Sequence, residues 1–118
     1  MARVDDIVSV LSKLRFRFVH EGDLQMGIAE VLERNKWEWQ PEVRLDRKNR
    51  LDFLVDGVCI EVKVDGSLAD LTRQLYRYAA FAEIRAFVVV TTRSSHLRLP
   101  CDVLGKPVKV VHLMPGIV

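Results

Sequence analysis

The chain has 118 residues, of which 49% are hydrophobic and 29% charged, a balance that excludes a disordered or fibrous protein. This length is typical of one domain with one core, so we expect a single domain over residues 1–118. No run approaches the roughly 18 apolar residues of a membrane span, and residues 1–13 lack a signal-peptide core, so we expect a cytoplasmic protein.

Two amphipathic helices are predicted first. Residues 4–14 place apolar side chains at helical spacing, with two aspartates in the first turn, where acids favour the helix dipole. Residues 21–35 repeat an apolar stripe at the same spacing. Glu21 therefore lies in the first turn of the second predicted helix.

Three strands are expected next. Residues 37–45 carry alternating and aromatic side chains, and Pro41 favours an edge position or a bulge for this strand. Residues 50–64 form two alternating runs joined by Asp56-Gly57, the dipeptide that favours a two-residue type I′ turn. We therefore predict a β-hairpin over residues 50–64.

A helix and two strands complete the predicted fold. Residues 67–84 return to helical period, and residues 86–90 are uniformly apolar, as expected of a buried central strand after a right-handed crossover. Residues 93–106 contain turn residues and are predicted to form a loop, before a last strand at 107–113. The order α-α-β-β-β-α-β-β predicts an α/β fold of the α+β type, with a mixed sheet.

The register of the hairpin predicts a pair of carboxylates. With Asp56-Gly57 as the loop, Val55 pairs with Val58, and Asp52 lies directly opposite Glu61. Opposed side chains have Cβ atoms roughly 4.5 to 5.5 Å apart. The opposite face of the hairpin is expected to be apolar, formed by Leu51, Phe53, Val55, Val58, Ile60, Val62 and Val64.

This carboxylate pair predicts a cation site. Two carboxylates at that distance repel unless one is protonated or a cation lies between them. Mg²⁺ takes carboxylate and carbonyl oxygens and keeps several waters, which this arrangement can offer. Lys63 lies on the same face as Asp52 and Glu61, where it can orient a metal-bound water.

These residues carry a resemblance to a known family. Asp52 followed by Glu61-Val62-Lys63 resembles the D…(D/E)-x-K signature of the PD-(D/E)XK nuclease superfamily. Glu21 matches a glutamate that this family often has on the helix before the sheet. Gln74 and Tyr78 match the Q-x-x-x-Y pattern of its RecB-like branch. The resemblance covers roughly residues 21–91 and implies a restriction-endonuclease-like α-β-β-β-α-β core, with an added N-terminal helix and C-terminal strand.

This chain departs from the name-giving motif of the family at one position, and that position varies within the family. Leu51 stands where the proline of the motif would be, and that proline takes no part in the chemistry. The resemblance therefore still implies a divalent-metal-dependent nuclease that uses Mg²⁺ or Mn²⁺ to hydrolyse DNA phosphodiester bonds and leaves a 5′-phosphate.

The resemblance gives each catalytic residue an expected role. Asp52, Glu61 and the backbone carbonyl of Val62 would bind the metal, Lys63 would position the attacking water, and Glu21 would support metal or water. A small domain of this family is expected to be a structure-selective endonuclease, like junction resolvases or small phage-type nucleases, acting on branched or single-stranded DNA, often as a homodimer. The alternative is a catalytically inactive nuclease-fold module that binds DNA or a protein partner.

Substrate contacts are expected beside these catalytic residues. Four basic residues flank the hairpin and are predicted to contact phosphates, with a charged loop as the alternative; they are Arg44, Arg47, Lys48 and Arg50. Gln74 and Tyr78 are supporting substrate contacts, unless they belong to an ordinary helix surface. Without Glu21, Asp52 and Glu61, 18 basic residues stand against 13 acidic ones, which suits a polyanionic partner.

The remaining aromatic, cysteine and histidine residues predict no further chemistry. Trp37 and Trp39 are expected to pack in the core rather than stack on bases, and together with Phe16 they are candidates for a dimer interface. Cys59 and Cys101 are 42 positions apart without a CxxC pair, which predicts reduced thiols rather than zinc ligands. The three histidines are dispersed and are assigned to neither metal nor catalysis.

Overall fold

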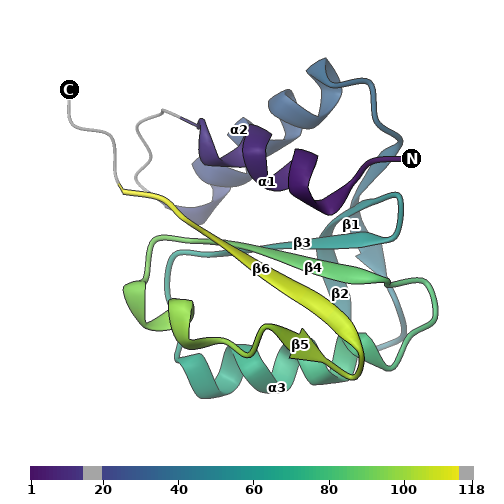
Figure 1. Ribbon diagram of the computed structural model, residues 1–118, viewed down its shortest axis with the longest axis vertical. Helices are drawn as coiled ribbons and strands as arrows, with labels where there is room; N and C mark the ends of the chain where they lie inside the picture. Colours follow the sequence, from purple (N-terminus) through teal and green to yellow (C-terminus); the bar gives the residue numbers. More distant parts are fainter. Residues whose placement is uncertain (15–19, 115–118) are drawn as a thin grey trace.

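The computed structural model describes residues 1–14 and 20–114 and shows an α+β domain with one mixed sheet (Figure 1). The sheet has six strands in the order β1-β2-β3-β4-β6-β5. In chain order the elements are α1 (Val4–Ser12), α2 (Glu21–Arg34), β1 (Trp39–Arg44), β2 (Arg50–Val55), β3 (Val58–Lys63), α3 (Leu68–Ala79), β4 (Ala86–Thr91), the 3₁₀ helix η1 (Ser94–Arg98), β5 (Asp102–Val103) and β6 (Lys106–His112).

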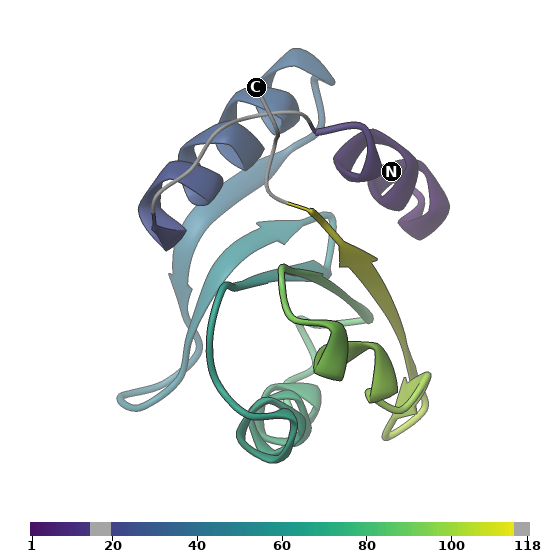
Figure 2. The same ribbon diagram turned by 90° about the vertical axis from the view of Figure 1, so that its left-hand side faces the viewer.

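Helices cover both faces of the sheet. Helices α1 and α2 lie on one face and α3 on the other, as Figures 1 and 2 both show. Each face has its own apolar cluster, one including Ile28 and Phe53 under α1 and α2, the other Leu75 and Phe87 under α3. None of the helices in the described part of the chain is long and apolar enough to cross a membrane.

The strand pairing confirms the predicted mixed sheet. Strands β1, β2 and β3 pair antiparallel, whereas β3, β4 and β6 are parallel. Every residue of β4 is buried, because helices cover both of its faces and strands flank both of its edges, as its uniformly apolar sequence predicts. Strand β1 lies at the edge of the sheet, where Pro41 removes no hydrogen bond from a central ladder.

The hairpin turn has the predicted geometry. Asp56 and Gly57 have φ values of 47° and 82°, and a type I′ turn requires a positive φ at both positions. Val55 pairs with Val58, and the pairing continues through Leu54 and Cys59. The turn is fastened to the rest of the fold by Arg85, whose Nε donates to the carbonyl of Asp56 at 2.6 Å.

The predicted end of the third helix was wrong. Helix α3 begins after Ser67, whose hydroxyl accepts from the Asp70 amide at 3.1 Å, but it ends at Ala79 rather than residue 84. The chain must turn back toward β4, and turns at Tyr78–Phe81 and Phe81–Ile84 bury Ile84 and leave Ala82 exposed. Apolar spacing continues through such turns and does not reveal the end of the helix.

The segment predicted as a loop at residues 93–106 contains η1 and β5. His96 in η1 is fully buried, with Nδ1 2.7 Å from Thr91 Oγ1 and Nε2 3.0 Å from the Gly66 carbonyl oxygen. These contacts join the end of β4 to the segment after β3. A single polar residue that becomes a core anchor gives no periodic signal in the sequence.

Candidate active site

Asp52 and Glu61 meet where β2 and β3 separate. The pairing of the two strands stops at Phe53 and Ile60, one position before the two acids. Asp52 Oδ2 accepts from the Val62 amide at 2.8 Å, and Glu61 Oε1 accepts from the Asp52 amide at 2.9 Å. Each acid therefore bonds to the backbone of the opposite strand, and these two bonds replace the next step of the ladder.

The predicted register is correct up to this point, but the predicted face of Leu51 was wrong. Leu51 packs in the cluster under α3 with Cys59, whereas Phe53 and Val55 pack under α1 and α2. Residues 51, 53 and 55 share a face only in a regular strand. The irregularity lies at Asp52, which lacks a partner in the pairing on either side, among the described strands.

Burial makes two negative charges unfavourable at this site. Glu61 is 2% exposed, and burial, followed by the charge of Asp52, raises the pKa of Glu61 from 4.5 to about 8. Burial also raises the pKa of Asp52, where the Val62 amide and Lys63 oppose the shift and the charge of Glu21 adds to it. A cation at the site would offset the burial of both carboxylates and the repulsion from Asp52 that adds to the raised pKa of Glu61.

Glu21 and Lys63 lie near the pair without bonding to it. Glu21 is the first residue of α2, and its charge raises the pKa of both Asp52 and Glu61. Lys63, at the end of β3, is half-buried and lowers both pKa values. Within residues 1–14 and 20–114, no hydrogen bond or ion pair engages the Lys63 ammonium, so it is available to a water or a phosphate.

The donor set fits a hard divalent cation with a partial protein shell. No group of three or more Asp, Glu, His or Cys side chains in the described residues is close enough to hold a metal, so Glu21 does not complete a three-acid set with the pair. Two carboxylates are sufficient for Mg²⁺, because it keeps several waters. The Val62 amide faces the gap between the strands, and the carbonyl of an extended residue points to the same edge as its amide.

One carboxylate oxygen of Glu61 is left for such a cation. Oε1 takes the Asp52 amide, with Cys59 Sγ 4.0 Å away, and no described residue bonds Oε2. No fully buried side-chain oxygen or nitrogen in the described residues lacks a partner. Oε2 therefore keeps some contact with solvent, although the side chain as a whole is buried.

Gln74 and Tyr78 brace the strand that carries Asp52. The Gln74 amide donates to the Tyr78 hydroxyl at 2.7 Å, and that hydroxyl donates to the Arg50 carbonyl at 2.9 Å. Burial of Tyr78, followed by the charge of Glu61, raises its pKa, so the hydroxyl stays protonated and remains a donor. Because this bond is made two residues before Asp52, it positions the acid; a direct contact with substrate stays a prediction.

We expect Tyr78→Phe to destabilise the protein by about 1 to 3 kcal/mol, because it leaves the Arg50 carbonyl and the Gln74 amide without their partner. Urea unfolding measures this loss. Tyr76→Phe is the matched control, since Tyr76 lies on the same helix with 45% of its surface exposed. Equal stability of the two variants would contradict the bracing role.

The four basic residues around the β1–β2 turn are exposed, as a phosphate contact requires. The charge of Arg50, the first residue of β2, lowers the pKa of Asp52. Arg44 also supports the β1–β2 turn, donating to the Arg47 carbonyl at 3.1 Å. In the same turn the Asp46 carboxylate accepts from the amides of Lys48 and Asn49, each at 2.8 Å. The turn is therefore ordered by its own side chains.

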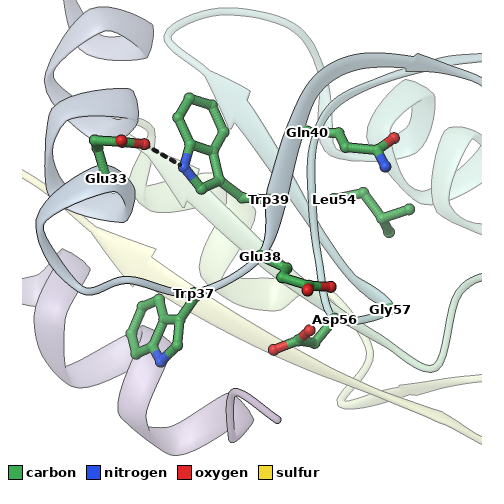
Figure 3. Close-up of a pocket in the computed structure, with 8 residues that line it drawn as sticks. All are labelled: Glu33, Trp37, Glu38, Trp39, Gln40, Leu54, Asp56 and Gly57. Atoms are coloured by element: carbon green, nitrogen blue, oxygen red, sulfur yellow. Dashed lines mark hydrogen bonds between the residues drawn. The ribbon is translucent and has the colours of Figure 1, made fainter.

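The two tryptophans lie away from the carboxylate pair. They line a groove of about 580 Å³ beside the hairpin turn, with Glu38 and Asp56 on its wall (Figure 3). Both pack against the core under α1 and α2, as predicted, and Trp39 Nε1 donates to Glu33 at 3.0 Å. The acids of this groove would repel a phosphate backbone. Phe16, the third interface candidate, lies outside the described residues.

Sequence reasoning missed Glu42. It lies in β1 beside Asp52, with a φ of 51°, and its position interrupts the β1–β2 pairing between Pro41–Phe53 and Val43–Leu51. A non-glycine residue rarely adopts this left-handed conformation. The only sequence signal is Pro41, which predicted an irregular strand but not which residue would absorb the irregularity.

Comparison of the chain with family models, with curated proteins and with solved structures finds no match. The assignment of a function therefore depends on the two acids, the lysine and the strand geometry that brings them together.

Proposed function

We propose that the protein is a divalent-metal-dependent nuclease of the PD-(D/E)XK type that hydrolyses DNA phosphodiester bonds, structure-selectively, in the cytoplasm. The observation that carries the proposal is the separation of β2 and β3 at two acids, the buried Glu61 and the half-buried Asp52, whose charges repel each other. A strand pair gains nothing in stability from such an arrangement. A bound cation would neutralise the two charges and so account for the arrangement.

The residues then have defined roles. Asp52, Glu61 and the Val62 carbonyl would hold Mg²⁺ or Mn²⁺. The ion would supply a water of lowered pKa and stabilise negative charge on the scissile phosphate. The Lys63 ammonium lies beside the pair without a hydrogen-bond partner among the described residues, so it can orient that water and the phosphate. Arg50, Arg44, Arg47 and Lys48 would hold the neighbouring phosphates of the DNA.

The proposal is tested by incubating the protein with single-stranded, branched, nicked and duplex DNA. We expect cleavage in Mg²⁺ or Mn²⁺, none in chelator, and none by Asp52→Asn, which removes the charge but keeps an oxygen for the Val62 amide. Glu83→Gln is the matched control, because Glu83 is an exposed acid after α3. Equal cleavage by the wild type and Asp52→Asn would refute the proposal.

A second candidate is a nuclease-fold module that binds DNA or a protein partner without cutting. The observation that favours it is that the described residues bring no third acid into a ligand set with Asp52 and Glu61. Calorimetric titration with Mg²⁺ and Mn²⁺ separates the two functions. Metal binding that Asp52→Asn abolishes supports the enzyme, and its absence from the wild type supports the binding module.

A further inference from the structure

A small cavity adjoins the carboxylate pair on the side of α2. Its volume is about 200 Å³, and Asp52 forms part of its wall. Phe53 lines it from β2 and Glu42 from β1, while α2 contributes Gln25, Met26 and Ala29. Because Asp52 belongs to both, a molecule that reaches the carboxylate pair also borders this cavity.

The backbone beside the cavity is distorted. Glu42 is held in the left-handed region at a φ of 51°, and the pairing of β1 with β2 is interrupted where Glu42 faces Asp52. Left-handed backbone is unfavourable for a residue with a side chain, and such strain concentrates at functional sites. The β1–β2 and β2–β3 pairings are thus both interrupted at Asp52, which belongs to the carboxylate pair and to the wall of the cavity.

The lining selects one part of a nucleotide. Met26, Ala29 and Phe53 give apolar contact, and the acids Glu42 and Asp52 would repel a phosphate. The flat faces of a base can pack on the apolar side chains, and its hydrogen-bond donors can pair with the two acids. The Gln25 amide can pair with either donors or acceptors on the edge of the base. The volume lies below the 300 Å³ or so of pockets for whole drug-sized ligands, and so suits a single base.

The geometry points to this cavity as the binding site for one unpaired nucleobase next to the scissile phosphate. A base inside a duplex is stacked, and its pairing edge is covered, so it cannot enter without leaving the helix. The inference rests on the proposed function and gives it a substrate class: DNA with an unpaired nucleotide beside the cut, in a single strand, flap or branch.

The test compares cleavage of intact DNA with cleavage of the same strand carrying an abasic site next to the mapped cut. Stacking and edge contacts of one base support about a tenfold faster cleavage of the intact strand by the wild type. Ala29→Phe, which fills the cavity, and Gln25→Ala, which removes an edge contact, should slow cleavage of intact DNA. Neither should slow cleavage of abasic DNA. Glu30→Ala, an exposed neighbour on α2 outside the cavity, should cleave both like the wild type.

The abasic strand also separates a filled cavity from a damaged fold. A variant that folds poorly cleaves both strands more slowly. If Ala29→Phe and Gln25→Ala each slow the cleavage of abasic DNA as much as that of intact DNA, the inference is overturned. Equal cleavage of intact and abasic DNA by the wild type would overturn it too, with the proposed function untouched. No cleavage of any DNA refutes the proposed function. Anisotropy titrations in chelator then still test the cavity, with about tenfold weaker binding of the abasic strand expected and equal binding contradicting it.

Discussion

Replacing Lys63 with alanine is expected to slow DNA cleavage by about 10²- to 10⁴-fold, the usual contribution of a group that positions or transfers a proton in the transition state. Lys63 ends β3 two residues after Glu61, and none of the described residues bonds its ammonium. In the proposed site the metal oxygens would come from Asp52, Glu61 and Val62, so the alanine variant should still bind Mg²⁺. Cleavage and metal binding are thereby separated.

Single-turnover rates and calorimetric Mg²⁺ titrations on the same preparations measure both quantities. Lys109→Ala is the matched control, since Lys109 is an exposed lysine on β6 and should keep the wild-type rate. If Lys63→Ala cleaves DNA at the wild-type rate, Lys63 has no role in the reaction. Loss of Mg²⁺ binding together with cleavage would assign Lys63 to holding the site instead.

Glu61→Gln is expected to stabilise the metal-free protein at alkaline pH while abolishing cleavage. The pKa of Glu61 is 4.5 at its ordinary value and about 8 in the fold. Between these pH values the folded protein holds a proton that the unfolded chain has released, so stability is greatest at the acid end and falls as pH rises. The loss is complete above pH 8 and totals on the order of a few kcal/mol. Asp52, whose pKa is also raised, contributes with the same sign.

Urea unfolding from pH 5 to pH 8.5 in chelator measures this slope. Glu61→Gln should flatten it, whereas Glu83→Gln should unfold like the wild type at each pH. Adding Mg²⁺ at pH 8 should restore stability to the wild type and not to Glu61→Gln, because a ligand that binds only the folded state stabilises it. If the Glu61→Gln variant keeps the wild-type dependence of stability on pH, that dependence does not come from the raised pKa of Glu61.

Local chemistry made the hairpin predictable. Asp56-Gly57 specifies a turn with two positive φ angles, and that turn fixes which residues of β2 and β3 face each other. The buried strand β4 was predictable for a similar reason, since a strand covered on both faces is almost entirely apolar. From these two elements the position of Asp52 near Glu61 follows without knowledge of the rest of the fold.

What the sequence could not predict depends on contacts between distant segments. Alternation places Leu51 with Phe53, but the irregularity at Asp52 turns Leu51 to the α3 face, and it arises where two ladders fail together. The burial of Glu61 was likewise missed, because an acid in an alternating strand is expected to face solvent. Glu61 is 2% exposed, and its charge raises the pKa of Tyr78, so a helix that follows it in the chain lies close to it.

The hydrogen bonds from the backbone to Asp52 and Glu61 should make metal binding at the site visible in backbone amide signals. The amide protons of Val62 and Asp52 each point at a carboxylate oxygen that would share its charge with a bound cation. The chemical shifts of these two amides should therefore respond to Mg²⁺ before any other backbone signal in β2 and β3. Two resonances in a protein of 118 residues would then follow occupancy of the site without substrate, label or turnover.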